Sequence, residues 1–209
     1  MASGDPSLRS SADGDLHDRI LALVTAVEAA DGFRPLSDQA WLDAVDGAAR
    51  GVALVETGSR LRGWAQVTDD DEPVIETVVD GDVDTRVDAV TSLLSSVRTA
   101  LPDRTLRWWA FAAGTWSDVV AERLDLSPVR DLLQVRITLP AAPTDVTTRP
   151  FRGGADEEAW LEVNAAAFAD HPEQGRWTHD DLVRREHEPW FAPEGFLLHE
   201  RAGRLAAFC

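Results

Sequence analysis

The sequence has one cysteine, no lysine and no tyrosine. Because the only cysteine is the last residue, Cys209, the chain cannot form an internal disulfide or a cysteine-based metal site. All 20 basic residues are arginine. Lysine, tyrosine and the scarce isoleucine have AT-rich codons, so the composition indicates a bacterial genome of high GC content.

Long apolar runs are also missing, since none approaches the roughly 18 residues that cross a bilayer. Residues 1–15 lack the basic and then apolar pattern of a secretory signal. We therefore expect a cytoplasmic protein without a membrane partner. The net charge of −17 repels nucleic acid and anionic lipid. The excess acid is either solvated surface or an acidic pocket for a cationic small molecule.

Several motifs of known chemistry are absent from the sequence: GxGxxG, GxxxxGK[ST], HExxH, GxSxG and CxxC. The five histidines do not have zinc-ligand spacing; His179 and His187, for example, are not four residues apart. We therefore expect no metal.

The first part of the chain, residues 15–139, predicts one α/β domain that follows a disordered lead-in over residues 1–14. Apolar residues from Leu16 to Val27 recur at helical spacing, and Ser37 is a candidate cap for a second helix carrying Trp41, Leu42 and Val45. Alternation, turn residues and caps then predict a hairpin over 51–67, strands at 74–79, 105–111 and 131–139, and helices at 83–101 and 115–124, the last opened by a capping box at 115–118.

A Pro- and Ala-rich linker over residues 140–145 precedes a restart of the same pattern in residues 146–209. The restart predicts a strand at 146–150, helices at 156–169 and from Thr178, and a hairpin over 195–208. Residues 51–61 align without a gap with residues 195–205, sharing Gly, Leu, Glu, Arg and Leu. This indicates an internal repeat, with chance similarity of two hairpins as the alternative.

Residues Asn164 to Thr178 are the most distinctive segment, because they contain His-Pro-Glu-Gln-Gly-Arg-Trp-Thr. This segment, and Trp-Phe-Ala-Pro-Glu-Gly at 190–195, resemble the second domain of the mycothiol synthases. Leu23-Val-Thr-Ala, Asp31-Gly32 and Asp38-Gln39 resemble the first domain. The resemblance implies tandem GNAT-like acetyltransferase domains in an α/β (α+β) fold. One copy is complete, and only the N-terminal half of the second is present, so we expect a C-terminally truncated chain.

The resemblance also implies a function: transfer of acetyl from acetyl-CoA to the cysteinyl amine of desacetylmycothiol, by a protein that is monomeric at full length. It assigns Asp38 and Glu173 to the substrate, and the backbone of Thr77, Val78 and Val79 to acetyl-CoA. It assigns no general base. The alternative roles are a helix-dipole acid for Asp38 and a turn-capping carboxylate for Glu173.

The loop after residues 74–79 departs from the family pattern. Acetyltransferases of this kind place glycines and a basic residue there to hold the pyrophosphate at a helix N-terminus. Here Asp80, Asp82 and Asp84 would repel it. We therefore expect a degraded cofactor loop and no turnover by this chain alone. A non-catalytic sugar-thiol-binding module and an N-acetyltransferase for another amine remain alternatives.

Overall fold

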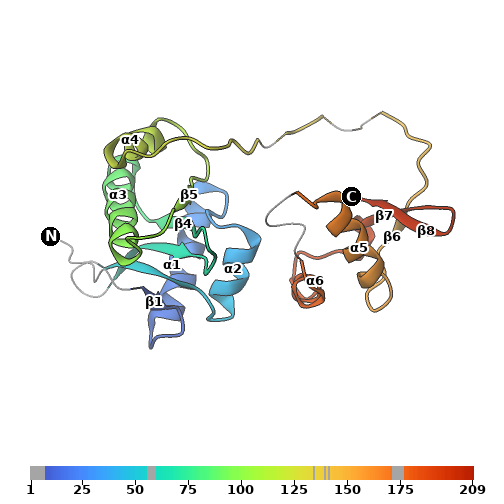
Figure 1. Ribbon diagram of the computed structural model, residues 1–209, viewed down its shortest axis with the longest axis horizontal. Helices are drawn as coiled ribbons and strands as arrows, with labels where there is room; N and C mark the ends of the chain where they lie inside the picture. The colour runs from blue at the N-terminus through green and yellow to red at the C-terminus, as the bar shows by residue number, and fades with distance from the viewer. Residues whose placement is uncertain (1–7, 56–59, 134, 139, 141, 171–176) are drawn as a thin grey trace. The chain divides into compact units, whose positions relative to one another are not determined.

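The computed structural model describes residues 8–55, 60–133, 135–138, 140, 142–170 and 177–209. The chain forms two compact units, residues 1–132 (unit 1) and 133–209 (unit 2) (Figure 1). No helix among the described residues is both long and apolar enough to cross a membrane.

Unit 1 is built on a five-stranded sheet of order β1-β2-β3-β4-β5, in which only the β4–β5 pair is parallel. Its elements along the chain are β1 (Arg9–Ser10), α1 (Leu16–Asp31), α2 (Asp38–Val45), β2 (Arg50–Val55), β3 (Leu61–Val67), β4 (Val74–Val79), α3 (Val83–Ala100), β5 (Arg107–Trp109) and α4 (Thr115–Leu124).

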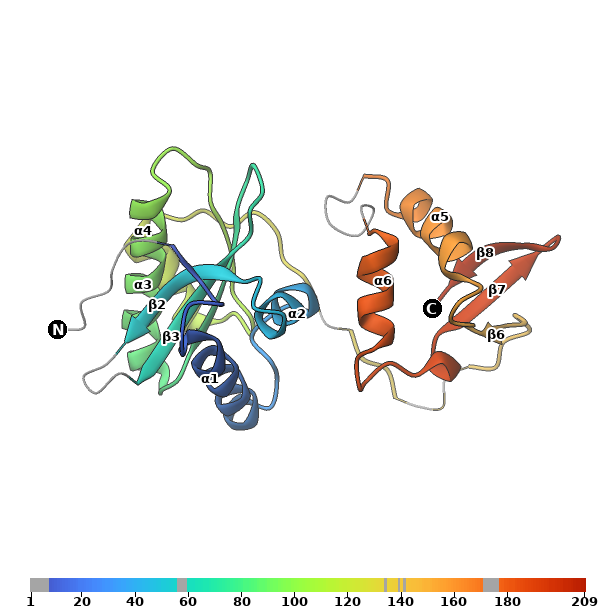
Figure 2. The ribbon, with the colours of Figure 1, turned by 90° about the horizontal axis from the view of Figure 1, so that it is seen from below.

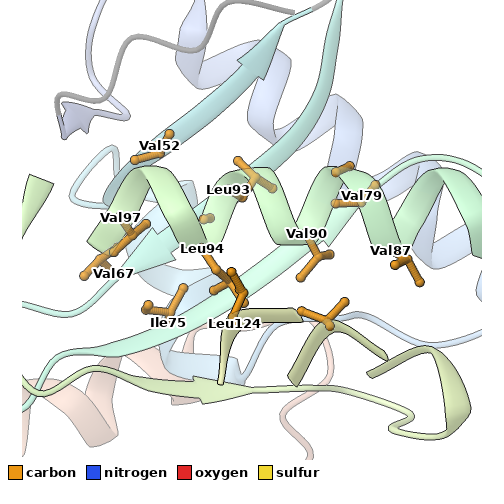
Figure 3. Packing of buried hydrophobic residues seen from close by; sticks show 13 residues of the cluster. Val52, Val67, Ile75, Val79, Val87, Val90, Leu93, Leu94, Val97 and Leu124 are labelled. Atoms are coloured by element: carbon orange, nitrogen blue, oxygen red, sulfur yellow. The ribbon is translucent and has the colours of Figure 1, made fainter. Parts of the chain in front are cut away.

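Both faces of this sheet are covered, by α1 and α2 on one side and by α3 and α4 on the other (Figures 1 and 2). Strand alternation divides β4 between the two cores: Val78 packs under α1, whereas Ile75 and Val79 pack under α3. Figure 3 shows Leu94 and Val97 of α3 directed at the strands beneath them. The sheet is thus the middle of three layers.

The parallel strands β4 and β5 pair over only three positions, from Val74 with Arg107 to Glu76 with Trp109. Residues 77–79 of β4 stay paired with β3 on the other side, but β5 ends at Trp109 and does not accompany them. One edge of β4 is therefore open at its C-terminal end, next to the start of α3.

Unit 2 has a three-stranded antiparallel sheet of order β6-β7-β8. Its elements are β6 (Arg149–Pro150), α5 (Glu157–Ala167), α6 (His179–Glu186), the short 3-10 helix η2 (Pro193–Gly195), β7 (Leu197–Arg201) and β8 (Arg204–Phe208). The sequence of strand, two helices and hairpin is the same as the opening of unit 1. Among its described residues, the core is a single cluster around Phe151, Trp160, Leu182 and Leu198.

Most predicted elements are confirmed, including α1 with its five buried apolar residues and Gly32 in the left-handed conformation that ends it. Ser37 caps α2 as predicted, and Thr178 forms a capping box with Asp181 at α6. The predicted apolar face of α2 is partly wrong. Val45 is exposed, and Ala40 and Ala44 are buried instead beside Leu42.

Three predictions over other segments are wrong. The lead-in is ordered in part, since Arg9 and Ser10 pair with β2 as strand β1. The helix α4 begins after Gly114, whose backbone N–H donates a hydrogen bond to the Ser117 hydroxyl. Thr115 is therefore inside the helix and is not its cap.

The strand predicted over residues 131–139 does not form in the described residues of that range. Leu133, Val135 and Ile137 alternate as in a strand, but each is at least 75% exposed. Alternation marks a segment that can join a sheet, but a strand also needs a neighbouring strand for its backbone hydrogen bonds, and the described residues of this segment join neither sheet.

Candidate functional site

The open edge of β4 borders a small cavity that is partly open to solvent. Thr77 and Val79 of β4 form one wall of this cavity. Phe33, from the loop after α1, and Phe111, from the loop after β5, form others, together with Trp116 of α4. Because a strand edge offers backbone N–H and C=O groups, the site combines hydrogen-bonding groups with aromatic walls.

An ion pair stands in the same cavity. Arg86, in the first turn of α3, donates two hydrogen bonds to the carboxylate of Asp31 at the end of α1, at 2.8 and 3.1 Å. Both side chains are only about one fifth exposed, and the Arg86 guanidinium lies 5.9 Å from the Trp116 ring. The pair ties α1 to α3 across the end of the sheet, and Asp31 offsets the charge of Arg86.

Two tryptophans order the aromatic side of the cavity. Trp108 of β5 donates from its indole nitrogen to the Thr77 hydroxyl at 3.2 Å, and so bridges the two strands just where they part. Its ring meets that of Trp116 edge-on, 5.8 Å between centroids. Since Thr77 belongs to the cavity wall, a ligand there would change the environment of both indoles.

A side chain of the loop between β4 and α3 occupies the anion position at the N-terminus of α3. Asp82 is the N-cap of α3, and its carboxylate accepts from the Thr85 backbone N–H at 2.9 Å. Its hydrogen bonds with Thr85 hold the pKa of Asp82 below its usual value, so the carboxylate is ionised at neutral pH. Asp80 accepts from Arg60 and lies 3.6 Å from Arg62. The helix terminus therefore already holds an anion.

A buried carboxylate fixes α2 to the sheet. Glu76 of β4, 8% exposed, accepts hydrogen bonds from both the backbone N–H and the hydroxyl of Ser37, each at 2.7 Å. Asp38 follows at the first position of α2, where its carboxylate is two thirds exposed and lies 3.9 Å from Arg34. Asp38 is thus held in place by its neighbour but is not part of the cavity wall.

The predicted site residues have different outcomes. Thr77 and Val79 line the cavity, whereas the Val78 side chain is buried under α1 and its backbone groups pair with Trp64 of β3. Glu173 lies outside the described residues. The sequence did not identify Phe33, Phe111 or Trp116, because loop residues and one helix residue from separate parts of the chain carry no shared spacing.

The charged groups of unit 2 that stand out are an ion-pair network around Arg149 and the partly buried carboxylate of Glu186. Arg149 binds both oxygens of Asp156, at 2.6 and 2.9 Å, and also Glu200 at 2.7 Å. The Arg149 guanidinium lowers the pKa of Asp156. Burial, reinforced by Glu157, raises the pKa of Glu186. Among the described residues, no group of three or more His, Cys, Asp or Glu side chains could hold a metal ion.

A solved structure of a GCN5-related N-acetyltransferase from Sphaerobacter thermophilus is similar to the chain, with a TM-score of 0.50 and 19% identity. The match covers 97% of this chain and 70% of that one. No family model matches the sequence. The structural likeness shows a GNAT acetyltransferase fold, in agreement with the predicted α/β class.

Curated relatives give a more specific result. The chain is 40% identical to a mycothiol acetyltransferase of Thermobispora bispora over 90% of its own length and 66% of that protein. The corresponding protein of Acidothermus cellulolyticus is 40% identical, with 91% and 62% covered. That of Kineococcus radiotolerans is 36% identical, with 99% and 73% covered.

The chain thus spans about two thirds of the length of the curated relatives it matches. The similarity extends through both units and agrees with the acetyltransferase fold. The chain belongs to the mycothiol acetyltransferase family.

Proposed function

We propose that this chain is part of an enzyme that transfers an acetyl group from acetyl-CoA to the cysteinyl amine of desacetylmycothiol. The observation that carries the proposal is the identity of about 40% to mycothiol acetyltransferases over about 90% of the chain. In the reaction, the neutral amine attacks the thioester carbonyl, the carbon–sulfur bond breaks, and the amine proton leaves while CoA departs as the thiol. The chain's own residues do not identify the base that removes the proton.

The cavity beside β4 suits one part of this chemistry. Pantetheine is a narrow chain with two amides, and the open edge of β4 offers the backbone groups of Thr77 and Val79 to such a chain. We propose that Thr77 and Val79 contact the pantetheine arm of the thioester through their backbone, on either side of Val78, whose own backbone pairs with β3. Phe111 and Trp116 would then exclude water from its apolar parts.

The acceptor bears hydroxyls and a cationic amine, which carboxylates bind well. We propose Asp38 and Glu173 as substrate carboxylates. The exposure of Asp38 leaves its oxygens accessible, and the Ser37–Glu76 contact holds the start of α2 to the sheet. Such anchoring is what a residue that orients a sugar requires.

The activity is tested with the product of the complete reading frame that contains these residues. We expect it to form mycothiol from acetyl-CoA and desacetylmycothiol, measured by chromatography of the labelled thiol, at a rate far above that with glucosamine, lysine or spermidine. Preferred acetylation of one of those amines would contradict the proposed substrate. The 209-residue chain alone is expected to give no turnover.

A second function, binding of the sugar thiol without catalysis, is favoured by the aspartates at the α3 terminus. Calorimetry of the 209-residue chain with desacetylmycothiol tests the binding step. We expect Asp38→Asn and Glu173→Gln each to weaken it, and Asp43→Asn, on the same helix as Asp38, to leave it unchanged. No heat at millimolar ligand would exclude this second function and the substrate roles of Asp38 and Glu173 in this chain.

A further inference from the structure

The N-terminus of α3 is the place in unit 1 where the phosphates of a nucleotide thioester would lie if the pantetheine followed β4. A helix N-terminus attracts anions because its first N–H groups point outward. Here the carboxylate of Asp82 already binds the Thr85 N–H at 2.9 Å. A phosphate oxygen would have to displace this intramolecular anion.

The side chain of Thr85 also lies against the loop. Gly81 packs so closely on Thr85 that a Cβ at Gly81 would lie 2.9 Å from the Thr85 methyl carbon. The loop therefore runs close to the helix terminus that Asp82 caps.

The cations around this loop also have carboxylate partners. Arg60 and Arg62 approach Asp80, and Arg86 donates to both carboxylate oxygens of Asp31. Asp84 adds a further negative charge in the first turn of α3. A pyrophosphate arriving here would meet the three aspartates Asp80, Asp82 and Asp84 against two arginines that share Asp80.

The cavity itself, unlike this loop, does not present an excess of negative charge to its ligand. Its walls are the β4 edge at Thr77 and Val79, the rings of Phe33, Phe111 and Trp116, and the mutually neutralising pair of Arg86 and Asp31. These groups suit an uncharged acyl chain with amides. The boundary between a cavity without net charge and the acidic loop falls between Val79 and Asp80.

We propose that this cavity selects a pantetheine thioester without phosphates, and that Asp82 is the specificity residue that disfavours the nucleotide-bearing form. The proposal rests on the proposed thioester site beside β4. Because Asp82 acts on the ligand's phosphates and not on its acyl arm, its effect appears only in the comparison of two ligands that share that arm.

The test is a titration of the 209-residue chain with S-acetylpantetheine and with acetyl-CoA at low ionic strength. The indole signals of Trp108 and Trp116, assigned with Trp→Phe variants, report occupancy of the cavity. We expect acetyl-CoA to bind about threefold or more weakly than S-acetylpantetheine, and the difference to shrink as salt screens the aspartates. A working phosphate site would show the opposite salt dependence, because salt weakens phosphate contacts.

The variant Asp82→Ser isolates the charge, because serine caps helices as well as aspartate does. We expect it to strengthen acetyl-CoA binding about fivefold, as removal of one charge at a helix terminus predicts, and to leave S-acetylpantetheine unchanged. Asp103→Ser, beyond the other end of α3, removes an equal charge and is expected to change neither ligand.

The possible outcomes are distinct. Tighter binding of acetyl-CoA than of S-acetylpantetheine by the native chain, or equal gains for both ligands in Asp82→Ser, would overturn the specificity role while the thioester site stands. If neither ligand shifts the indole signals of the native chain, the thioester site beside β4 is itself wrong, and the specificity proposal with it.

Discussion

Units 1 and 2 open with the same order of elements but differ in how their sheets are covered. The sheet of unit 1 has α1 and α2 on one face and α3 and α4 on the other, with a hydrophobic cluster in each layer. Unit 2 has one cluster, centred on four buried residues and surrounded by aromatic rings. The same opening pattern therefore gives a three-layer unit in one case and a unit that depends on few contacts in the other.

The largest expected effect is on the aromatic core of unit 2. Trp160→Ala removes a buried ring that lies 5.1 Å from Phe208 and 5.4 Å from Trp177, and should lower the free energy of unfolding by about 3–5 kcal/mol. Because this core is small, we expect unit 2 to lose its amide protection in hydrogen exchange while unit 1 keeps its own.

The matched control is Trp190→Ala, because Trp190 is 50% exposed. It should leave both units protected. Loss of protection in both units on replacing Trp160 would show that their stabilities are coupled, and would break the comparison.

The second expected effect tests how α2 is fixed in unit 1. Glu76→Ala leaves the Ser37 N–H and hydroxyl without their carboxylate acceptor and should destabilise unit 1 by about 2 kcal/mol. Glu72→Ala, which removes an exposed partner of Arg107, should cost less than about 0.5 kcal/mol. Urea unfolding followed by unit 1 signals measures both, and equal losses would contradict the anchoring role.

The third effect concerns the pH dependence of unit 2. Arg149 lowers the pKa of Asp156 in the folded state. The stabilisation of unit 2 by the ionised Asp156 carboxylate is therefore present above about pH 4 and is lost as the pH falls further. Asp156→Asn should lower the free energy of unfolding by about 1 kcal/mol at pH 7 and reduce the further loss of stability below about pH 4. Glu162→Gln, which removes an exposed partner of Arg204, serves as control in thermal unfolding between pH 3 and 7. If Asp156→Asn lost as much stability at low pH as the native chain does, the role given to the Asp156–Arg149 pair would be refuted.

The smallest effect has the opposite sign. Burial and Glu157 raise the pKa of Glu186, so folding disfavours its ionised form, and this unit should gain stability as the pH falls through the raised pKa. Glu186→Gln should therefore stabilise unit 2 at pH 7 by about 0.5 kcal/mol, whereas Glu158→Gln, on the exposed face of α5, should not. Destabilisation by Glu186→Gln in thermal unfolding at pH 7 would contradict this reading.

Local signals predicted most elements, and they failed where a partner was needed. The spacing of Leu16 to Val27 predicted α1, and Ser37 and Thr178 predicted two helix starts. The alternation of Leu133, Val135 and Ile137 predicted a strand that the described residues of the segment do not form, because a strand depends on a neighbour that sequence alternation does not reveal.

The repeat alignment shows a similar limit. Gly51 and Gly195 are aligned, but only Gly51 lies in a strand where a Cβ would collide with the Ala65 carbonyl oxygen, whereas at Gly195 a Cβ would meet open space. The shared residue type therefore follows from a tight contact in one copy and not in the other.

The sequence by itself determined the helices, the caps at Ser37 and Thr178, the two hairpins and the family resemblance, because periodicity, capping and motifs act over a few residues. Only the tertiary structure decided which residues meet at the site. Arg86 reaches Asp31 across 55 positions and Glu76 reaches Ser37 across 39, because the sheet brings the ends of β4, α1 and α3 together. The cavity depends on where β5 stops, a property of strand pairing that no single segment encodes.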